Sequence, residues 1–490
     1  MTPSDPALAD PAPALVSALA PTADAGTAAP DAPELPTAAD LEDIQGLVYS
    51  AWTDHRYAGF LFARLGDDPA AGRRWLDAAR RLVTPAARHR RRTDGRLQIA
   101  LSPTGLTALG VPDDVIAMMA PEATSGMASR RRVLADSDAR TWELGGPGDR
   151  LDALVMVYTR DPETRDAELA RHRAALLAAG ATVRTGELGW PMMGDREHFG
   201  FADGLSQPFV PGFHGRPRPG EDPIPVGEVV LGYRNAYGRL PLTPIWNDFD
   251  LGRNGSYLVF RKLDQHVAAL WGWLADHARR LAGDDPAAVD QLTELLGAKV
   301  VGRWRSGAPL TLTPDRDDPE LARPDRRNNF DFLAHDADGL RCPISAHIRR
   351  ANPRDARGGG RDESRTVVGR HRILRRGRSY GPPLPREAAL AGRDDGVPRG
   401  LYFLCLQSSI ARGFEFIQQT WLANPGFLGM HSEPDPIVGD SGGKCHFTIP
   451  AAPVRMRLSG MPTVVTSRGG GYFFLPSLAA LARIAAGPGR

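Results

Sequence analysis

One short segment, residues 342–354, places a potential metal ligand beside several cations. It reads Cys-Pro-Ile-Ser-Ala-His-Ile-Arg-Arg-Ala-Asn-Pro-Arg, so His347 is followed by Arg349, Arg350 and Arg354. A neutral imidazole can bind iron, and guanidinium groups can hold the carboxylates of a bulky anionic cofactor. Haem combines these needs, because its iron takes an axial ligand and its propionates attract cations. Alone, the segment is a weak indication, since most histidines bind no metal.

A second segment, residues 199–208, sets an acid among aromatic side chains. Gly200 and Gly204 flank Phe201-Ala202-Asp203, and glycines let a backbone turn tightly and approach a flat cofactor closely. Asp-Gly is also a favoured turn pair, so an ordinary turn explains the pattern when it is taken alone. As a site residue, Asp203 would be a proton shuttle in apolar surroundings.

The third segment, residues 371–381, is rich in arginine and includes Arg375, Arg376 and Gly377. Most arginines in such a stretch belong to a solvated basic loop. One guanidinium that points into a pocket could instead orient a bound peroxide and stabilise negative charge while the O–O bond breaks.

Other chemistries have less support. His198 and His371 are flanked by charged residues, and His266 and His277 fall on an expected helix. The H-E-x-x-H pattern of zinc hydrolases is absent from the sequence, and the glycine-rich stretches at 358–360 and 469–472 lack phosphate-loop spacing. Neither a zinc enzyme nor a nucleotide enzyme is therefore indicated.

Size and composition favour a globular protein of two domains with insertions. The chain has 490 residues, of which 42% are hydrophobic and 24% charged. The formal net charge of +2 gives no reason to expect a nucleic-acid partner. The sequence contains no uninterrupted apolar run long enough for a membrane span, which needs about 18 residues. Its three cysteines leave one unpaired, which fits a reducing compartment.

The first 40 residues are rich in Ala, Pro and Asp, and we expect them to be a disordered tail. The first arginine is Arg56 and prolines interrupt each apolar run, so no export signal is recognised. A cytoplasmic location is expected.

The elements that must position these residues begin after the tail. Apolar periodicity predicts a β-α-β-β-α-β order, which is the ferredoxin-like plan of an antiparallel sheet with helices on one face. The predicted elements are a strand at 44–52, a helix at 70–82, strands at 97–101 and 151–158, a helix at 163–179 and a strand at 182–188.

A second unit resembles the first, with long insertions. It is predicted from a strand at 255–261, a helix at 264–282, a strand at 400–406 and a helix at 411–422. Residues 354–370, rich in Gly, Arg and Asp, are expected to form a mobile loop. The chain is thus predicted to be α+β, with an N-terminal domain at 41–240 and a C-terminal domain at 241–490.

Taken together, the three segments resemble in type and order the signature of the dye-decolourising peroxidases. Further similarity lies at residues 43–46, 254–261 and 413–418 with Trp421, so the match runs from about residue 41 almost to the C-terminus. The resemblance implies two ferredoxin-like domains with antiparallel sheets, and one haem b per chain bound mainly by the C-terminal domain.

Carried over residue by residue, the resemblance makes His347 the iron ligand and Asp203 with Arg375 the distal pair. It also suggests Glu415 as the acid that hydrogen-bonds to the proximal imidazole, with another Asp or Glu near that helix as the alternative. Arg350 is a candidate partner for the propionates.

Two residues of the predicted strand at 400–406 are candidates for the pocket wall. Leu401 and Phe403 alternate along the strand and therefore share one side, so both could face the haem. Plain core packing is an equally good explanation of this pair.

The expected activity is a haem-dependent peroxidase that reduces hydrogen peroxide and oxidises dyes, phenols or similar small-molecule donors in one-electron steps. The alternative is a haem-binding or haem-handling protein without significant turnover, although such a carrier has no need of a distal acid–base residue. No nucleic-acid or membrane partner is expected, and a homo-oligomer is compatible with the sequence.

Overall fold

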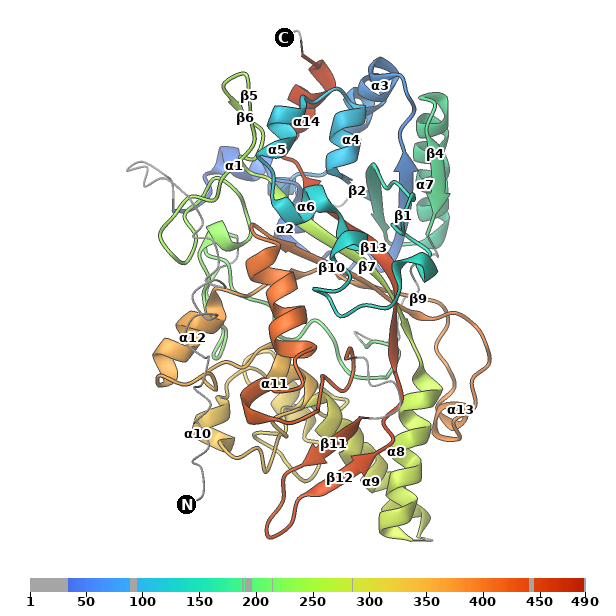
Figure 1. Ribbon diagram of the computed structural model, residues 1–490, viewed down its shortest axis with the longest axis vertical. Helices are drawn as coiled ribbons and strands as arrows, with labels where there is room; N and C mark the ends of the chain where they lie inside the picture. The colour runs from blue at the N-terminus through green and yellow to red at the C-terminus, as the bar shows by residue number, and fades with distance from the viewer. Residues whose placement is uncertain are drawn as a thin grey trace, which may run out of the picture.

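The computed structural model describes residues 34–88, 95–186, 189, 196–213, 215–283, 285–439 and 445–488. A nine-stranded antiparallel sheet crosses the middle of the molecule, with helices on both sides of it along its length (Figure 1). The strands follow the order β4-β1-β3-β2-β13-β7-β10-β8, and β9 also pairs with β10. The α+β class with antiparallel strands is therefore confirmed.

The strands of this sheet come from both halves of the chain. They are β1 (Tyr57–Arg64), β2 (Gly95–Leu101), β3 (Ala153–Thr159), β4 (Thr182–Thr185), β7 (Ser256–Gln265), β8 (Leu374–Arg375), β9 (Arg378–Tyr380), β10 (Gly400–Gln407) and β13 (Val465–Leu475). Two small hairpins lie apart from it, β5 (Ile245–Trp246) with β6 (Phe249–Asp250) and β11 (His446–Ile449) with β12 (Met456–Ser459).

The first half has the predicted order of elements, but its first strand is β1 and not residues 44–52. That apolar stretch contains the short helix α2 (Gly46–Tyr49), which buries Leu47 and Val48. An apolar run of this length does not distinguish a strand from a buried helical turn, so the prediction was wrong there. Residues 57–64 are richer in aromatic side chains and pair along their length with β3.

The other elements of this half are confirmed. The predicted helices are α3 (Pro69–Arg80) and α7 (Pro162–Ala178), and each starts with a proline after an aspartate whose carboxylate accepts a backbone N–H bond. The predicted strands at 97–101 and 151–158 are β2 and β3. The strand predicted at 182–188 is β4, which ends at Thr185, and residues 187 and 188 lie outside the described part of the chain.

In the second half, the predicted strands are β7 and β10, and the predicted helix at 264–282 is α8 (Val267–Ala282). The predicted helix at 411–422 forms two π-helical pieces, η6 (Ala411–Glu415) and η7 (Ile417–Leu422). The mobile loop predicted at 354–370 is wrong in its second part. There the helix α12 (Arg361–Gly369) buries Ser364 and Val368 under a charged outer face.

The remaining helices are shorter or lie at the periphery of the sheet. They are α1 (Ala38–Asp43), α4 (Pro103–Ala108), α5 (Asp113–Ala117), α6 (Pro121–Ser125), α9 (Pro286–Val301), α10 (Phe332–Asp336), α11 (His347–Ala351), α13 (Arg386–Leu390) and α14 (Leu478–Ala486). Of the tail expected to be disordered, residues 1–33 lie outside the described part, and the prediction is wrong for 38–40. These residues begin α1, whose N-terminus is stabilised by a capping box between Thr37 and Asp40.

Two layers of core cover the two faces of the sheet. On one face, Leu61 and Val259 pack with residues of α3 and α14, including Trp75 and Leu481. On the other face, Phe60 and its neighbours pack against the segment 210–233. In Figure 1, α3, α4, α7 and α14 lie around the upper part of the sheet, while α8 to α12 lie below.

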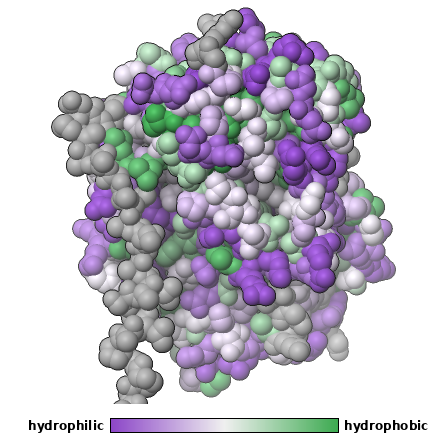
Figure 2. All heavy atoms as spheres, turned by 45° about the horizontal axis from the view of Figure 1, so that its top comes forward, coloured by the Kyte–Doolittle hydropathy of each residue, from purple (hydrophilic) through white to green (hydrophobic). Residues whose placement is uncertain are grey.

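On the surface seen in Figure 2, hydrophilic side chains are spread over the described residues and hydrophobic ones form small separate groups. In the described part of the chain, no helix combines the length and apolar character needed to cross a bilayer.

One buried amide joins the start of the described chain to the middle and to the end. The Gln45 side chain donates to the carbonyls of Ile99 and Pro476, both at 2.8 Å, and accepts from the Ile99 N–H at 3.0 Å. Gln45→Ala leaves these buried backbone groups without partners, so we expect a loss of about 2–4 kcal/mol in the free energy of unfolding. Urea denaturation measures it.

The control is Gln291→Ala, at an exposed position on α9. Its free energy of unfolding should stay within about 0.5 kcal/mol of the wild-type value. An equal effect of both substitutions would contradict the role assigned to Gln45.

Candidate active site

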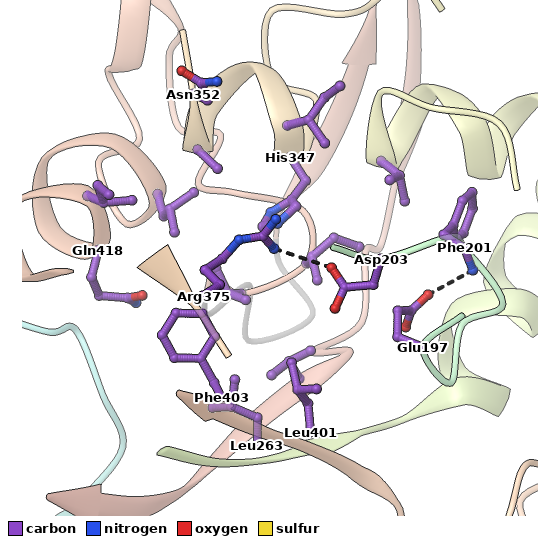
Figure 3. A pocket seen from close by; sticks show the side chains of 18 of the residues that line it. Glu197, Phe201, Asp203, Leu263, His347, Asn352, Arg375, Leu401, Phe403 and Gln418 are labelled. Atoms are coloured by element: carbon purple, nitrogen blue, oxygen red, sulfur yellow. Dashed lines mark hydrogen bonds and ion pairs between the residues drawn. The ribbon is translucent and has the colours of Figure 1, made fainter. Parts of the chain in front are cut away.

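A cavity of about 460 Å³ lies against the second-half part of the sheet. Its floor is one face of that sheet. Leu401 stands opposite Leu263 and Phe403 stands opposite Arg261, and directly opposed residues of antiparallel strands share a face. Arg375 joins the same face through the pairing of β8 with β10. Strand alternation therefore brings Arg375, Leu401 and Phe403 to one wall (Figure 3).

Other elements form the remaining walls. His347 is the first residue of α11, and Gln418 lies on η7, which Figure 3 shows on the side of the cavity away from Asp203. The loop at 197–206 carries Asp203 and closes the opposite side. The three segments singled out from the sequence thus meet in one place, although they are far apart along the chain.

The His347 ring is held by a carboxylate from a distant loop. Its Nδ1 lies 3.0 Å from both carboxylate oxygens of Asp435. Asp435 is fully buried, and its Oδ1 also accepts the backbone N–H groups of Ile437 and Val438 at 2.9 Å. An ionised Asp435 requires the proton on Nδ1. Among the described residues nothing hydrogen-bonds to Nε2 of His347, so this nitrogen is available as a lone-pair donor.

The electrostatics of this pair keep Asp435 ionised beside the ring. Burial raises the pKa of Asp435, but the His347 charge and hydrogen bond, with help from Arg350, outweigh burial and lower the pKa overall. Burial likewise lowers the pKa of His347, and Asp435 more than reverses this, so the pKa of the imidazole is raised. The carboxylate makes the ring more basic and so a stronger electron donor to a metal.

The expected role of Glu415 is wrong. Its carboxylate pairs with Arg130 and accepts the Tyr472 hydroxyl at 2.8 Å. Glu415 lies on η6 and points toward the first half of the chain, while Asp435 contacts the imidazole. The alternative of another acid near this helix is the one that the structure supports.

Asp203 and Arg375 form an ion pair inside the cavity. Arg375 Nη1 lies 3.3 Å from Asp203 Oδ1, and both side chains remain partly exposed. The Gln207 side chain fixes the loop to the strand, because its Nε2 donates to the Arg375 carbonyl at 3.2 Å and its Oε1 accepts the Arg375 N–H at 3.1 Å. An acid and a cation therefore face the same small space.

Three further arginines line the cavity without a carboxylate partner. In the described part of the chain, Arg303, Arg354 and Arg372 form no ion pair, and their guanidinium groups donate to backbone carbonyls or to Asn328. Burial lowers the pKa of Arg354 to about 9 and that of Arg303 and Arg372 to about 10, and repulsion among the arginines adds to this. The charge of this cluster is therefore suited to an anion.

Arg354 also adopts a strained backbone conformation, with φ 53°. A non-glycine residue in this region costs about 1 kcal/mol or more and is found most often at functional sites. Its guanidinium stacks over the Phe330 ring at 4.0 Å, which fixes its position at the cavity wall.

The expectation that Arg350 contacts the cofactor is wrong. Arg350 is fully buried outside the cavity wall, and its guanidinium donates to carbonyls of Trp421, Leu422, Asn424 and Glu433. Arg349 likewise donates hydrogen bonds within the protein, to the Asp336 carboxylate and the Cys342 carbonyl. Of the three arginines that follow His347, only Arg354 reaches the cavity.

The residues present fit a haem. A flat apolar floor, a histidine with a free Nε2 and a carboxylate on its other nitrogen, and buried arginines that lack an anion match the iron, the macrocycle and the propionates. The described residues contain no cluster of three or more His, Cys, Asp or Glu that could hold a bare metal ion.

Several of these residues were missed from the sequence. Asp435 lies in a Pro-rich loop 88 positions after His347, and Arg303 and Arg372 resemble many other arginines of the chain. No local signal marks them. Gln207 could have been found, since it follows Asp203 by four positions in the same segment.

Comparison with known proteins gives a consistent result. No protein-family model matches the sequence. The dye-decolorizing peroxidase msp1 of Mycetinis scorodonius is 32% identical over 497 residues, which cover 93% of this chain and 91% of that protein. A solved ancestral D-type dye decolorizing peroxidase has a TM-score of 0.77 at 33% identity, with 90% of this chain and 98% of that one covered. A dye-decolorizing peroxidase solved in complex with 2,6-dimethoxyphenol has a TM-score of 0.77 at 28% identity, with 91% and 99% covered.

The pairing of His347 with Asp435 can be tested without a cofactor. In Asp435→Asn the opposing burial remains and the charge is lost, so the pKa of His347 should fall below its wild-type value. A pH titration of the ring resonances by NMR, assigned with His347→Gln, measures the change. Glu415→Gln should leave this titration unaltered, and a shift in that variant would restore the rejected assignment.

Proposed function

The chain belongs to the dye-decolorizing peroxidase family and is a peroxidase, and from this premise we propose that its cavity holds one haem b with His347 as the axial ligand. One observation carries the proposal. The free Nε2 of His347, fixed by Asp435 on the other ring nitrogen, shares a single cavity with the Asp203–Arg375 pair.

Bound haem would supply an iron that exchanges electrons with peroxide and with reducing substrates. Asp203 accepts a proton from one oxygen of hydrogen peroxide and returns it to the other, which can then leave as water. Arg375 orients the peroxide and stabilises the negative charge that develops on it. Gln207 keeps the arginine and the acid in reach of each other.

The apolar floor and the arginine cluster have separate roles in this proposal. Leu401 and Phe403 line the cavity, where they would exclude water and provide an apolar surface for the macrocycle. Arg354, Arg303 and Arg372 would hold the propionates, which supply the anionic charge that these buried cations lack. Arg350 lies outside the cavity wall and fixes the backbone near Asp435, because it donates a hydrogen bond to the Glu433 carbonyl.

The reducing substrates proposed for this chain are dyes, phenols and similar small donors. The support is the relationship to proteins named for dye decolorization and to a structure with 2,6-dimethoxyphenol bound. Each donor gives up electrons one at a time, so the acid and the arginine need act only in the peroxide step.

We also propose two ferredoxin-like domains, at 41–240 and 241–490, with haem bound mainly by the second. In support, β4-β1-β3-β2 and β13-β7-β10 with β8 and β9 repeat one strand order, and most of the cavity wall comes from the second half. The three free cysteines support the proposed cytoplasmic location.

The peroxide step should depend on both distal residues. Asp203→Ala removes the proton acceptor and Arg375→Ala removes the cation, so each should slow the reaction with peroxide by about 10²- to 10⁴-fold while haem remains bound. Stopped-flow absorption after one equivalent of peroxide measures this rate in the haem-loaded protein. A wild-type haem spectrum that does not respond to peroxide would favour the haem-handling alternative.

The arginine cluster can be tested through haem retention. Arg354→Gln loses a charged hydrogen bond to a propionate, so haem should dissociate about 10-fold faster or more. Transfer to an excess of haem-free myoglobin, followed by absorption, measures the rate. Arg350→Gln is the matched control, since it removes a buried arginine that lies outside the cavity wall and hydrogen-bonds to backbone carbonyls. Equal haem loss in the two variants would contradict the propionate role of Arg354.

A further inference from the structure

A second acid lies on the cavity wall and has no part in the mechanism above. Glu197 begins the loop that ends at Asp203, and it lines the same cavity. Figure 3 shows it below and beside Asp203, with its carboxylate turned toward the loop. Its hydrogen bonds explain what it does there.

The Glu197 carboxylate closes the loop on itself. One oxygen accepts the Phe199 N–H at 2.8 Å and the other accepts the Phe201 N–H at 2.9 Å (Figure 3). The backbone of Glu197 adds two bonds, because its N–H donates to the Phe201 carbonyl at 3.1 Å and its carbonyl accepts the Gly200 N–H at 2.8 Å. One residue thus defines the course of the backbone two positions before Asp203.

The same carboxylate ties the loop to the floor of the cavity. Gln265, at the end of β7, donates its Nε2 to Glu197 Oε2 at 2.7 Å. Gln265 lines the cavity and lies two residues from Leu263, whose partner across the strands is Leu401. The contact therefore fixes the distance between the loop and the strands that form the floor of the cavity.

Gly200 shows how little freedom this loop has. Its φ is 90°, and a Cβ built there would lie 2.7 Å from the Arg305 guanidinium. Arg305 also accepts the Ala202 N–H on its carbonyl at 3.2 Å. Arg305 thus restrains the backbone at Gly200 and Ala202. The Glu197 carboxylate supplies the further restraint, through its hydrogen bonds to the N–H groups of Phe199 and Phe201.

We propose that Glu197 is a positioning residue for the peroxide reaction, which holds the Asp203 loop at its working distance from Arg375 and the floor of the cavity. The inference rests on the proposed function for its meaning. Its geometric content, that Glu197 sets the position of Asp203, stands separately.

The electrostatic setting favours a functional over a purely structural reason for an acid here. Burial raises the pKa of Glu197 to about 7, against its hydrogen bonds, and Asp203 faces it with a like charge. Arg305 approaches the loop at Gly200, and Gln265 on β7 is neutral. A buried acid that is costly to ionise does not maximise the stability of the fold. Its presence is therefore explained by the hydrogen bonds that it makes to the loop.

The decisive variant is Glu197→Gln, which keeps the size of the side chain but points an amide donor at a backbone N–H. In the haem-loaded protein, we expect the peroxide step to slow by about 10- to 100-fold, because an error of about 1 Å in a catalytic group costs up to that much. Cyanide association, followed by absorption, should slow in the same direction, since the ligand enters as an acid that must give its proton to Asp203.

Two further variants separate positioning from general stability. Gln265→Leu removes only the donor from β7 and should give a smaller loss of the same kind. Asp161→Asn weakens a carboxylate that caps α7 far from the cavity, so it should leave both rates unchanged. If Glu197→Gln lowers thermal stability but alters neither the peroxide rate nor cyanide association, Glu197 is structural and the proposal is overturned.

The pH dependence of stability gives a separate check on the acid itself. A carboxyl whose pKa is raised in the folded state stabilises below its unfolded pKa, and that contribution is lost as pH rises through about 7. The melting temperature of the wild type relative to Glu197→Gln should therefore fall between about pH 4.5 and pH 7 and then level off. A difference that stays constant across this range would contradict the burial argument.

A crystal structure of Glu197→Gln distinguishes failure of this inference from failure of the proposed function. If the wild type does not react with peroxide, the proposed function fails, yet a displaced Asp203 in the variant would still support the positioning role. An Asp203 that stays within hydrogen-bond distance of Arg375, in a loop of unchanged course, would overturn it.

Discussion

The period of two along antiparallel strands is the constraint on which this site depends. Leu401 and Phe403, their partners Leu263 and Arg261, and Arg375 on the adjoining strand reach one surface only because their register is direct. A slip of one residue in β10 would turn the wall over and replace it with Tyr402 and Leu404, which are packed into the opposite core. The precision of the site is thus set by backbone pairing, before any side chain interacts with another.

Negative and positive groups lie on different sides of the cavity, and they differ in whether they have a partner of opposite charge. On one side of the cavity a buried carboxylate, Asp435, is matched by the imidazole and by backbone N–H groups. On another side the buried Arg303 and Arg354 and the half-buried Arg372 donate hydrogen bonds only to neutral partners among the described residues. Burying charge without a counter-charge is expensive, so an anionic ligand that binds there would stabilise the folded chain as well as complete the site.

Much of this could be predicted from the sequence, because strong periodicity and local chemistry mark it. The predicted helices include α3 and α7, each with an aspartate cap and a following proline, and the predicted strands include β10, which carries both Leu401 and Phe403. The segments that carry His347, Asp203 and Arg375 stand out as a set through their resemblance to one family, and the structure brings the three residues to one cavity. Each of these signals is contained within about ten residues.

What failed depends on contacts between distant residues. The apolar stretch at 44–52 predicts a strand, but β1 occupies that place in the sheet, and no local signal in the sequence shows this. Glu415 and Asp435 are both buried acids of the second half, and only the path of the chain decides which one meets the imidazole. Similarly, Arg350 and Arg354 look equivalent in sequence, but Arg354 lines the cavity and Arg350 is buried outside it.

The last strand of the sheet has a consequence for how the protein is made. Among the named strands of the described chain, β13 joins the two halves of the sheet because it lies between β2 and β7, and its residues Val465 and Ser467 complete the cavity wall. A nascent chain can pair β1 to β4 early in translation, but β7 keeps an open edge until residues 465–475 leave the ribosome. The cavity wall is therefore incomplete until these residues are in place, and a chain truncated before residue 465 would present an unpaired edge of β7.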